Sequence, residues 1–217
     1  MSTSFLHQQQ VMLEPETYTG GIAQTNGHLL RLQGGTLLVD APDGVAAWLE
    51  GKNIRVDALL LTHQHFDHVQ DAALVKQAHG CPIYSWSPYS QDLTLERLYG
   101  AVTGSAFSVP PYAVDHVLEG TSDSITVGGA SWQLFHIPGH SPDSVCFWQP
   151  EENLLMSGDV IFLDSIGRCD FPGGSLQQLV SGIREKLGPL PDATRVHPGH
   201  GPSTTLGREK RENPYLD

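Results

Sequence analysis

The chain has 217 residues, 39% of them hydrophobic and 17% charged, and 24 acidic against 12 basic side chains give a formal net charge of −12. This is an ordinary globular composition, which excludes a disordered chain, a collagen and a coiled coil. Phosphate binding needs clustered cations, and the longest basic run is the short segment 208–211. We therefore expect no nucleic acid and no membrane surface among the partners.

The chain shows no sign of export or of disulfide bonding. No stretch approaches the ~20 apolar residues that cross a bilayer, and residues 1–10 lack the basic and apolar regions of a signal peptide. The three cysteines, Cys81, Cys146 and Cys169, are odd in number and too far apart for a metal knuckle. We expect a cytoplasmic protein with free thiols, whose residues 1–217 form a single domain.

The predicted strands come in two groups along the chain, and helices follow each group. Glycine pairs at 34–35 and 128–129 predict tight hairpins, and helical spacing predicts helices over 69–79 and 176–187. Residues 87–120 are polar and proline-rich, so we interpret them as an excursion from the core. Apolar or alternating runs predict strands at 28–33, 36–40, 58–62, 82–86, 124–127, 131–136, 145–149, 154–157 and 194–197. This order favours an α+β fold with two sheets face to face and helices outside.

A histidine cluster follows the apolar run 58–61. It contains four potential metal ligands within six residues, His63, His65, Asp67 and His68. Three imidazoles and a carboxylate at the mouth of a buried strand repel one another or stay unsatisfied unless a divalent cation collects them. The alternative is a histidine-rich surface turn. The concentration of histidine favours the metal site.

Three further candidates, His140, Asp159 and His200, each stand next to a glycine near the end of a predicted strand. Any one of them alone is more typical of a hydrogen-bonded turn residue. Strand ends, however, place side chains at one rim of a layered fold, where ligands from separate segments can meet. Together with the cluster, these residues predict a metal centre.

These motifs resemble the metallo-β-lactamase superfamily over residues 26–216. Asp40 after a strand, the motif His63-x-His65-x-Asp67-His68, and then His140, Asp159 and His200 have the order and spacing of that superfamily. Its compact glyoxalase II-like (hydroxyacylglutathione hydrolase-like) branch is similar in the tracts 158–162, 167–174, 198–202 and 213–216. The resemblance implies a four-layer αββα sandwich.

The resemblance also implies a ligand set for two metal ions. One ion would be held by His63, His65 and His140, the other by Asp67, His68 and His200, with Asp159 bridging them. Nitrogen and oxygen ligands without thiolate suit two Zn²⁺ and also admit iron or manganese. Asp40 is implied to orient a ligand imidazole without binding metal itself. Its alternative role is to cap a turn.

A thioesterase is the activity that the resemblance implies. A metal-bridging hydroxide, with Asp67 and Asp159 as catalytic carboxylates, would cleave small anionic thioesters similar to S-acylglutathione. Arg168 is implied to anchor a carboxylate of the thiol carrier, and the alternative is a surface ion pair with Asp170 or Asp164. Gly201-Pro202-Ser203 follows His200 where glyoxalase II has a tyrosine. The glutathione specificity therefore stays open.

Other interpretations remain. A persulfide dioxygenase would use one iron on His63, His140 and Asp159. A lactonase or another ester hydrolase would use the same hydroxide, and a metal-stabilised binding protein would have no turnover. A group of aromatic residues either lines a substrate pocket or belongs to the core, namely Trp86, Tyr89, Tyr99, Phe107 and Tyr112.

Overall fold

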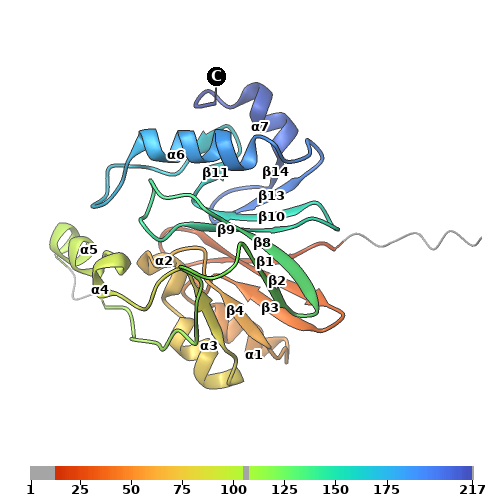
Figure 1. The fold of residues 1–217 in the computed structure, drawn as a ribbon. Coiled ribbons are helices and arrows are strands. Elements are labelled where there is room, and N and C mark those ends of the chain that lie inside the picture. Colours follow the sequence, from red (N-terminus) through yellow and green to blue (C-terminus); the bar gives the residue numbers. More distant parts are fainter. Residues whose placement is uncertain (1–12, 105–107, 217) are drawn as a thin grey trace, which may run out of the picture.

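The computed structural model describes residues 13–104 and 108–216. Two six-stranded mixed sheets lie face to face in it, with helices on both outer faces (Figure 1). This is the expected α+β fold with αββα layers. Phe107 lies outside the described residues, so the structure does not test its predicted role.

The first sheet has the strand order β1-β2-β3-β4-β5-β6. β1, β2 and β3 pair antiparallel, and the pairs from β3 to β6 are parallel. The hairpin predicted at 34–35 joins β2 to β3. The strands are β1 Glu16–Gly20, β2 Thr25–Leu32, β3 Gly35–Val39, β4 Ala58–Leu60, β5 Ile83–Ser85 and β6 His116–Val117.

The second sheet has the order β14-β13-β10-β9-β8-β7, and β10 and β13 form its parallel pair. Gly128 and Gly129 make the predicted hairpin between β7 and β8, both with positive φ. A separate two-stranded ribbon pairs β11 Ile161–Phe162 with β12 Ser165–Ile166. The main strands are β7 Ser124–Val127, β8 Ala130–His136, β9 Val145–Gln149, β10 Leu154–Gly158, β13 Arg195–Pro198 and β14 Thr204–Thr205.

Helices cover the two outer faces. α1 Val45–Gly51 and α3 Ala72–His79 lie against the first sheet, and α6 Leu176–Gly182 and α7 Leu206–Glu212 lie over the second (Figure 1). A π-helical turn, Ile183–Leu187, continues α6. The short helices α4 Gln91–Thr94 and α5 Glu96–Thr103 extend from the layers at the left of Figure 1. The excursion at 87–120 is therefore partly helical.

The helix predicted over 69–79 is wrong at its start. α2 Phe66–Val69 ends before α3 begins at Ala72. The His68 carbonyl accepts from the Ala41 amide, and the Asp71 amide donates to the Ala41 carbonyl. The backbone of residues 68–71 pairs with Ala41 and does not continue a helix, so the predicted helix begins at Ala72 and the separate short helix α2 precedes it.

Successive side chains of a strand point to opposite faces of the sheet, and in this way they form three apolar layers. In β3, Leu37 and Val39 enter the layer between the sheets, whereas Leu38 faces α1 and α3. In β10, Met156 faces the middle layer and Leu155 faces α6. Strands covered on both faces are apolar at successive positions, which explains the continuous runs in the sequence. None of the helices in 13–104 and 108–216 is long and apolar enough to cross a membrane.

Candidate metal centre

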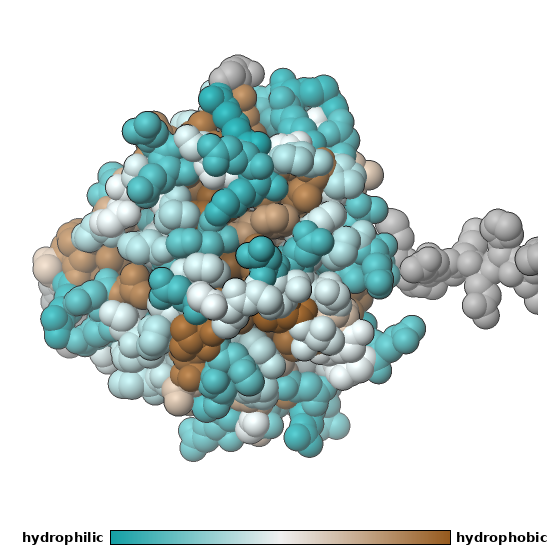
Figure 2. Space-filling view, in the orientation of Figure 1, coloured by the Kyte–Doolittle hydropathy of each residue, from teal (hydrophilic) through white to brown (hydrophobic). Residues whose placement is uncertain are grey.

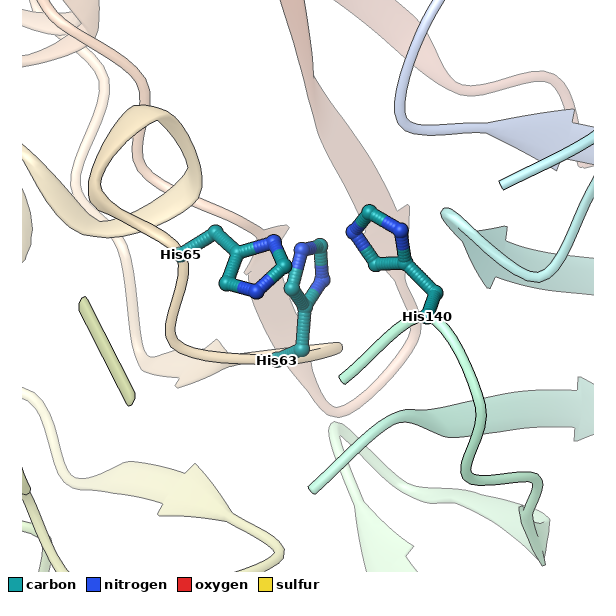
Figure 3. Close-up of side chains that lie close together, drawn as sticks. All are labelled: His63, His65 and His140. Carbon is teal, nitrogen blue, oxygen red and sulfur yellow. The ribbon is translucent and has the colours of Figure 1, made fainter. Parts of the chain in front are cut away.

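Strand ends bring all seven predicted ligands to one rim of the sandwich. His63 and His65 stand in the loop after β4, and His140 follows β8 (Figure 3). Asp159 follows β10 directly, and His200 comes two residues after β13. Potential ligand atoms lie within 4.8 Å of one another in three overlapping groups, namely His63-His65-His140, His63-His68-Asp159 and Asp67-His68-His200.

Asp159 lies between the two sets of histidines. Its Oδ2 is 3.4 Å from His140 Nε2 and 3.3 Å from His200 Nε2, and its Oδ1 is 3.3 Å from His68 Nε2. Asp67 Oδ2 is 3.2 Å from His200 Nε2. This arrangement places one carboxylate where it can touch both implied metal positions, and the other carboxylate at one of them.

Hydrogen bonds hold three of the imidazoles by Nδ1. His68 Nδ1 lies 2.8 Å from Asp40 Oδ2, His63 Nδ1 lies 3.1 Å from Thr62 Oγ1, and His140 Nδ1 lies 2.8 Å from the Arg168 carbonyl. A neutral histidine whose Nδ1–H is engaged in this way presents a bare Nε2, which is the form that binds a metal ion. Such partners typically orient metal-binding imidazoles.

The atoms facing the centre lack partners within the described chain. His63 Nε2, His68 Nε2, His140 Nε2 and Asp159 Oδ1 are all buried and make no hydrogen bond of good geometry, although His68 and His140 lie 3.3 and 3.4 Å from Asp159 oxygens. Buried polar groups are almost always satisfied, because an unpaired one costs free energy. Four unpaired atoms at one point, all nitrogen or oxygen, fit a divalent cation of the zinc, iron or manganese type.

Asp40 lies behind this centre. One carboxylate oxygen accepts from the Thr62 amide at 2.8 Å, and the other accepts from the Thr62 hydroxyl at 2.7 Å and faces His68 Nδ1. Asp40 has a φ of 60°, a conformation that aspartate tolerates better than most residues. These contacts are those expected of a residue that orients His68. Thr62, which the sequence left without a role, links Asp40 to His63 as well.

The histidines of the centre differ in pKa, because burial and the carboxylates shift it in opposite directions. Burial lowers the pKa of His63 and His140, and it lowers the pKa of His65 to about 3. Burial alone would also lower the pKa of His68 and His200, but the surrounding carboxylates, above all Asp159, raise it in both, to about 10 in His200. The carboxylates thus attract positive charge to the position that a metal ion would take.

Two glycines allow the ligand loops to approach one another. A Cβ on Gly199 would lie 2.3 Å from Asp159 Oδ1 and 2.5 Å from His68 Cε1, and a Cβ on Gly167 would lie 2.0 Å from the Asp159 carbonyl. Any side chain at either position would collide with the centre. The glycine before His200 is therefore required by packing, and Gly167 is a site residue that the sequence reasoning did not assign.

The centre lies in a cavity of about 700 Å³. Arg168 lines this cavity, but its guanidinium makes two 2.6 Å hydrogen bonds to Asp170 and lies over the Phe171 ring. Of the four described aromatic candidates, Tyr99 lines the cavity. The other three pack in or against apolar clusters elsewhere, namely Trp86, Tyr89 and Tyr112.

The fold and this centre define a metal-dependent hydrolase. The family model of the metallo-beta-lactamase superfamily matches residues 20–200, and the chain belongs to that superfamily. Among its relatives is the probable metallo-hydrolase YqgX of Bacillus subtilis, which is 33% identical over 91% of this chain and 94% of that protein. Hydroxyacylglutathione hydrolase GloC of Haemophilus influenzae is 36% identical over 78% of this chain and 80% of its own length.

Solved structures agree with this placement. The BLEG-1 B3 metallo-beta-lactamase superposes with a TM-score of 0.84 at 33% identity, over 94% of this chain and 99% of that one. TTHA1623 in a di-iron-bound form superposes with a TM-score of 0.78 at 38% identity, over 93% of this chain and 100% of that one. The protein is thus a metallo-hydrolase of the superfamily.

Proposed function

We propose that the protein is a dinuclear zinc thioesterase that hydrolyses small S-acyl thiols of the S-acylglutathione type. The observation that carries the hydrolase assignment is the convergence of four buried atoms without hydrogen bonds, two of them on His140 and Asp159, which line the cavity. The similarity to GloC supports a thioester as the substrate. Two-metal centres are common in hydrolases that attack carbonyl and phosphoryl groups.

The residues of the chain prepare this reaction. Metal ions bound here would supply hydroxide near neutral pH and positive charge facing a developing oxyanion. Asp159 would contribute ligand oxygens to both ions, because its oxygens face His68 on one side and His140 on the other. Asp67 would hold the second ion together with His68 and His200. A thiolate leaves without strong acid assistance, since the pKa of a free thiol is ~8.5.

Elemental analysis and a substrate panel test this proposal. We expect about two zinc ions per chain and hydrolysis of S-acylglutathione, with a lactone and a β-lactam cleaved more slowly. Iron is the main alternative metal, because TTHA1623 was solved with a di-iron centre. Iron in the purified protein together with oxygen uptake on glutathione persulfide would favour a persulfide dioxygenase and reject the thioesterase.

Arg168 remains our prediction for the anchor of an anionic thiol carrier. Arg168→Ala is expected to raise KM for S-acylglutathione about three- to fivefold with little change in kcat, because an exposed ion pair contributes at most ~1 kcal/mol. Asp170→Asn is the matched control. It frees the guanidinium from its present partner, so KM should fall or stay unchanged. An unchanged KM in Arg168→Ala would reject the anchor role.

A further inference from the structure

The cavity that holds the metal centre has an apolar wall on one side. α5 contributes Leu98, Tyr99 and Val102 to this wall, and Leu95 precedes the helix. These four residues have the spacing i, i+3, i+4 and i+7, which places them on one face of the helix. On most surface helices such a face packs on the core. Here it faces the cavity.

Two of these residues are exposed although they are large and apolar. Leu98 is 40% and Val102 is 78% exposed, whereas most of the other large apolar side chains are buried. Figure 2 shows hydrophobic surface at the left, where α5 lies in Figure 1. The ring of Tyr99 lies 4.7 Å from the ring of Phe66, which precedes Asp67. The apolar wall is thus continuous with the metal ligands.

The cavity lining also includes two charged residues. Arg168 and Asp170 contribute them, on the segment whose Arg168 carbonyl holds His140, next to the apolar side chains of Phe162, Ile166 and Phe171. A thioester carbonyl at the metal centre has an acyl chain on one side and a thiol carrier on the other. A polar carrier suits the Arg168 side and an apolar chain suits α5.

On the basis of the proposed thioesterase function, we propose that the enzyme selects thioesters with an apolar acyl chain of about four or more carbons, which packs along α5 against Leu98 and Val102. Burying a methylene completely changes affinity about fourfold, and an open wall buries about half of it. Each of the four added methylenes then contributes about twofold, so we expect kcat/KM to rise about 15-fold from the acetyl to the hexanoyl thioester of glutathione.

Variants of the wall test this specificity. Leu98→Ser and Val102→Ser should each reduce kcat/KM for the hexanoyl thioester about threefold more than for the acetyl thioester. Leu74→Ser is the matched control, because Leu74 is 48% exposed on α3 and lies outside this cavity. A rate that does not depend on chain length, or an equal chain-length dependence in Val102→Ser and the wild type, would overturn the proposal.

A binding measurement separates this inference from the proposed function. Saturated carboxylates from acetate to octanoate are titrated calorimetrically into the zinc-loaded protein. If no thioester is hydrolysed, the thioesterase proposal fails, while a rise in carboxylate affinity with chain length, weakened in Val102→Ser, still supports the apolar wall. Carboxylate affinity that is independent of chain length would contradict the wall under either outcome.

A different observation concerns the start of β2. The amide group of Asn26 donates to the carbonyls of Pro198 and Gly201, at 3.1 and 3.0 Å, on either side of His200. The Asn26 backbone N–H donates to the Gly199 carbonyl at 2.8 Å. Thr19 Oγ1 donates to Asn26 Oδ1 at 2.7 Å, which fixes the orientation of the amide.

Thr25 contacts Asp67, which is another predicted ligand of the same site. Its hydroxyl donates to Asp67 Oδ2 at 2.7 Å. Adjacent residues of β2 therefore hold the loop of His200 and the carboxylate of Asp67, while His63 and His140 are held by Thr62 and by the Arg168 carbonyl. We infer that Thr25 and Asn26 are positioning residues that set the affinity of the Asp67-His68-His200 site alone.

Zinc binding measured against a competing chelator tests this inference without any activity assay. Thr25→Val and Asn26→Ala should each weaken one of the two zinc sites about 10- to 100-fold and leave the other unchanged. Thr121→Val is a matched control, because the Thr121 hydroxyl donates to the Leu118 carbonyl at 2.6 Å and contacts neither a predicted ligand nor the His200 loop. Equal weakening of both sites, or unchanged affinity at both in Thr25→Val, would overturn the inference.

Discussion

Replacing Asp159 by alanine is expected to lower kcat/KM by about 10⁴-fold and the zinc content below one ion per chain. Asp159 lies within 3.4 Å of His68, His140 and His200, so its removal deprives both metal positions of their shared carboxylate. Metal centres contribute several kcal/mol to hydrolysis, and each 1.36 kcal/mol is tenfold in rate. Steady-state kinetics and elemental analysis of the same preparation measure both effects.

Asp192→Ala is the control for this variant. Asp192 is exposed and pairs with Lys210 on the surface, so its loss should change neither metal content nor rate. An Asp159→Ala protein with two zinc ions and the wild-type rate would show that the centre described here is not the active site. Loss of zinc from Asp192→Ala as well would indicate general instability and would remove the support that Asp159→Ala lends to the site.

Zinc binding is expected to release protons and to strengthen as the pH rises. In the metal-free protein the carboxylates raise the pKa of His68 and His200, so both side chains are positively charged imidazolium groups at neutral pH. Metal binds the deprotonated form, and each displaced proton makes the affinity up to tenfold stronger per pH unit. Competition with a chelator at pH 6, 7 and 8 measures this slope.

The variant His200→Asn separates the two protons. It should lower the number of protons released per chain by about one, as measured by calorimetry in buffers of different ionisation enthalpy. A wild-type affinity that does not depend on pH between 6 and 8 would contradict the charge distribution described here.

The stability of the metal-free protein should change with pH in the opposite direction to its zinc affinity. A raised histidine pKa adds stability that is fully present below the unfolded value near 6.5 and is lost as the pH rises through the folded value, about 10 for His200. The metal-free protein should therefore lose stability between pH 7 and 10. Chemical denaturation at several pH values in the presence of a chelator measures this loss.

Local patterns predicted most of the fold. Runs such as 58–61 are apolar at successive positions because both faces of β4 are covered, and Leu59 and Leu60 do enter different layers. The elements that the sequence missed have weak local signals. β1 has a half-exposed pattern, α1 has no side-chain cap, and α5 turns its apolar face to a cavity.

The candidate ligands could also be predicted from the sequence. Four of them lie within six residues, and the other three stand beside glycines near strand ends, so residue type and spacing were enough to single them out as candidates. The residues that orient these candidates could not be predicted from the sequence, because the contacts join segments that are far apart along the chain. Asn26 and Pro198 are 172 positions apart, and His140 and Arg168 are 28 apart.

The amino-acid sequence by itself determined the layers and the identities of the candidate ligands, since both depend on hydrophobic period and donor chemistry. Tertiary structure decided which imidazole nitrogen faces the centre, that the guanidinium of Arg168 pairs with Asp170, and that α5 forms a cavity wall. The physical reason is that hydrogen bonds and packing are short-range in space but not in sequence. They exist only once the sheets have brought the strand ends together.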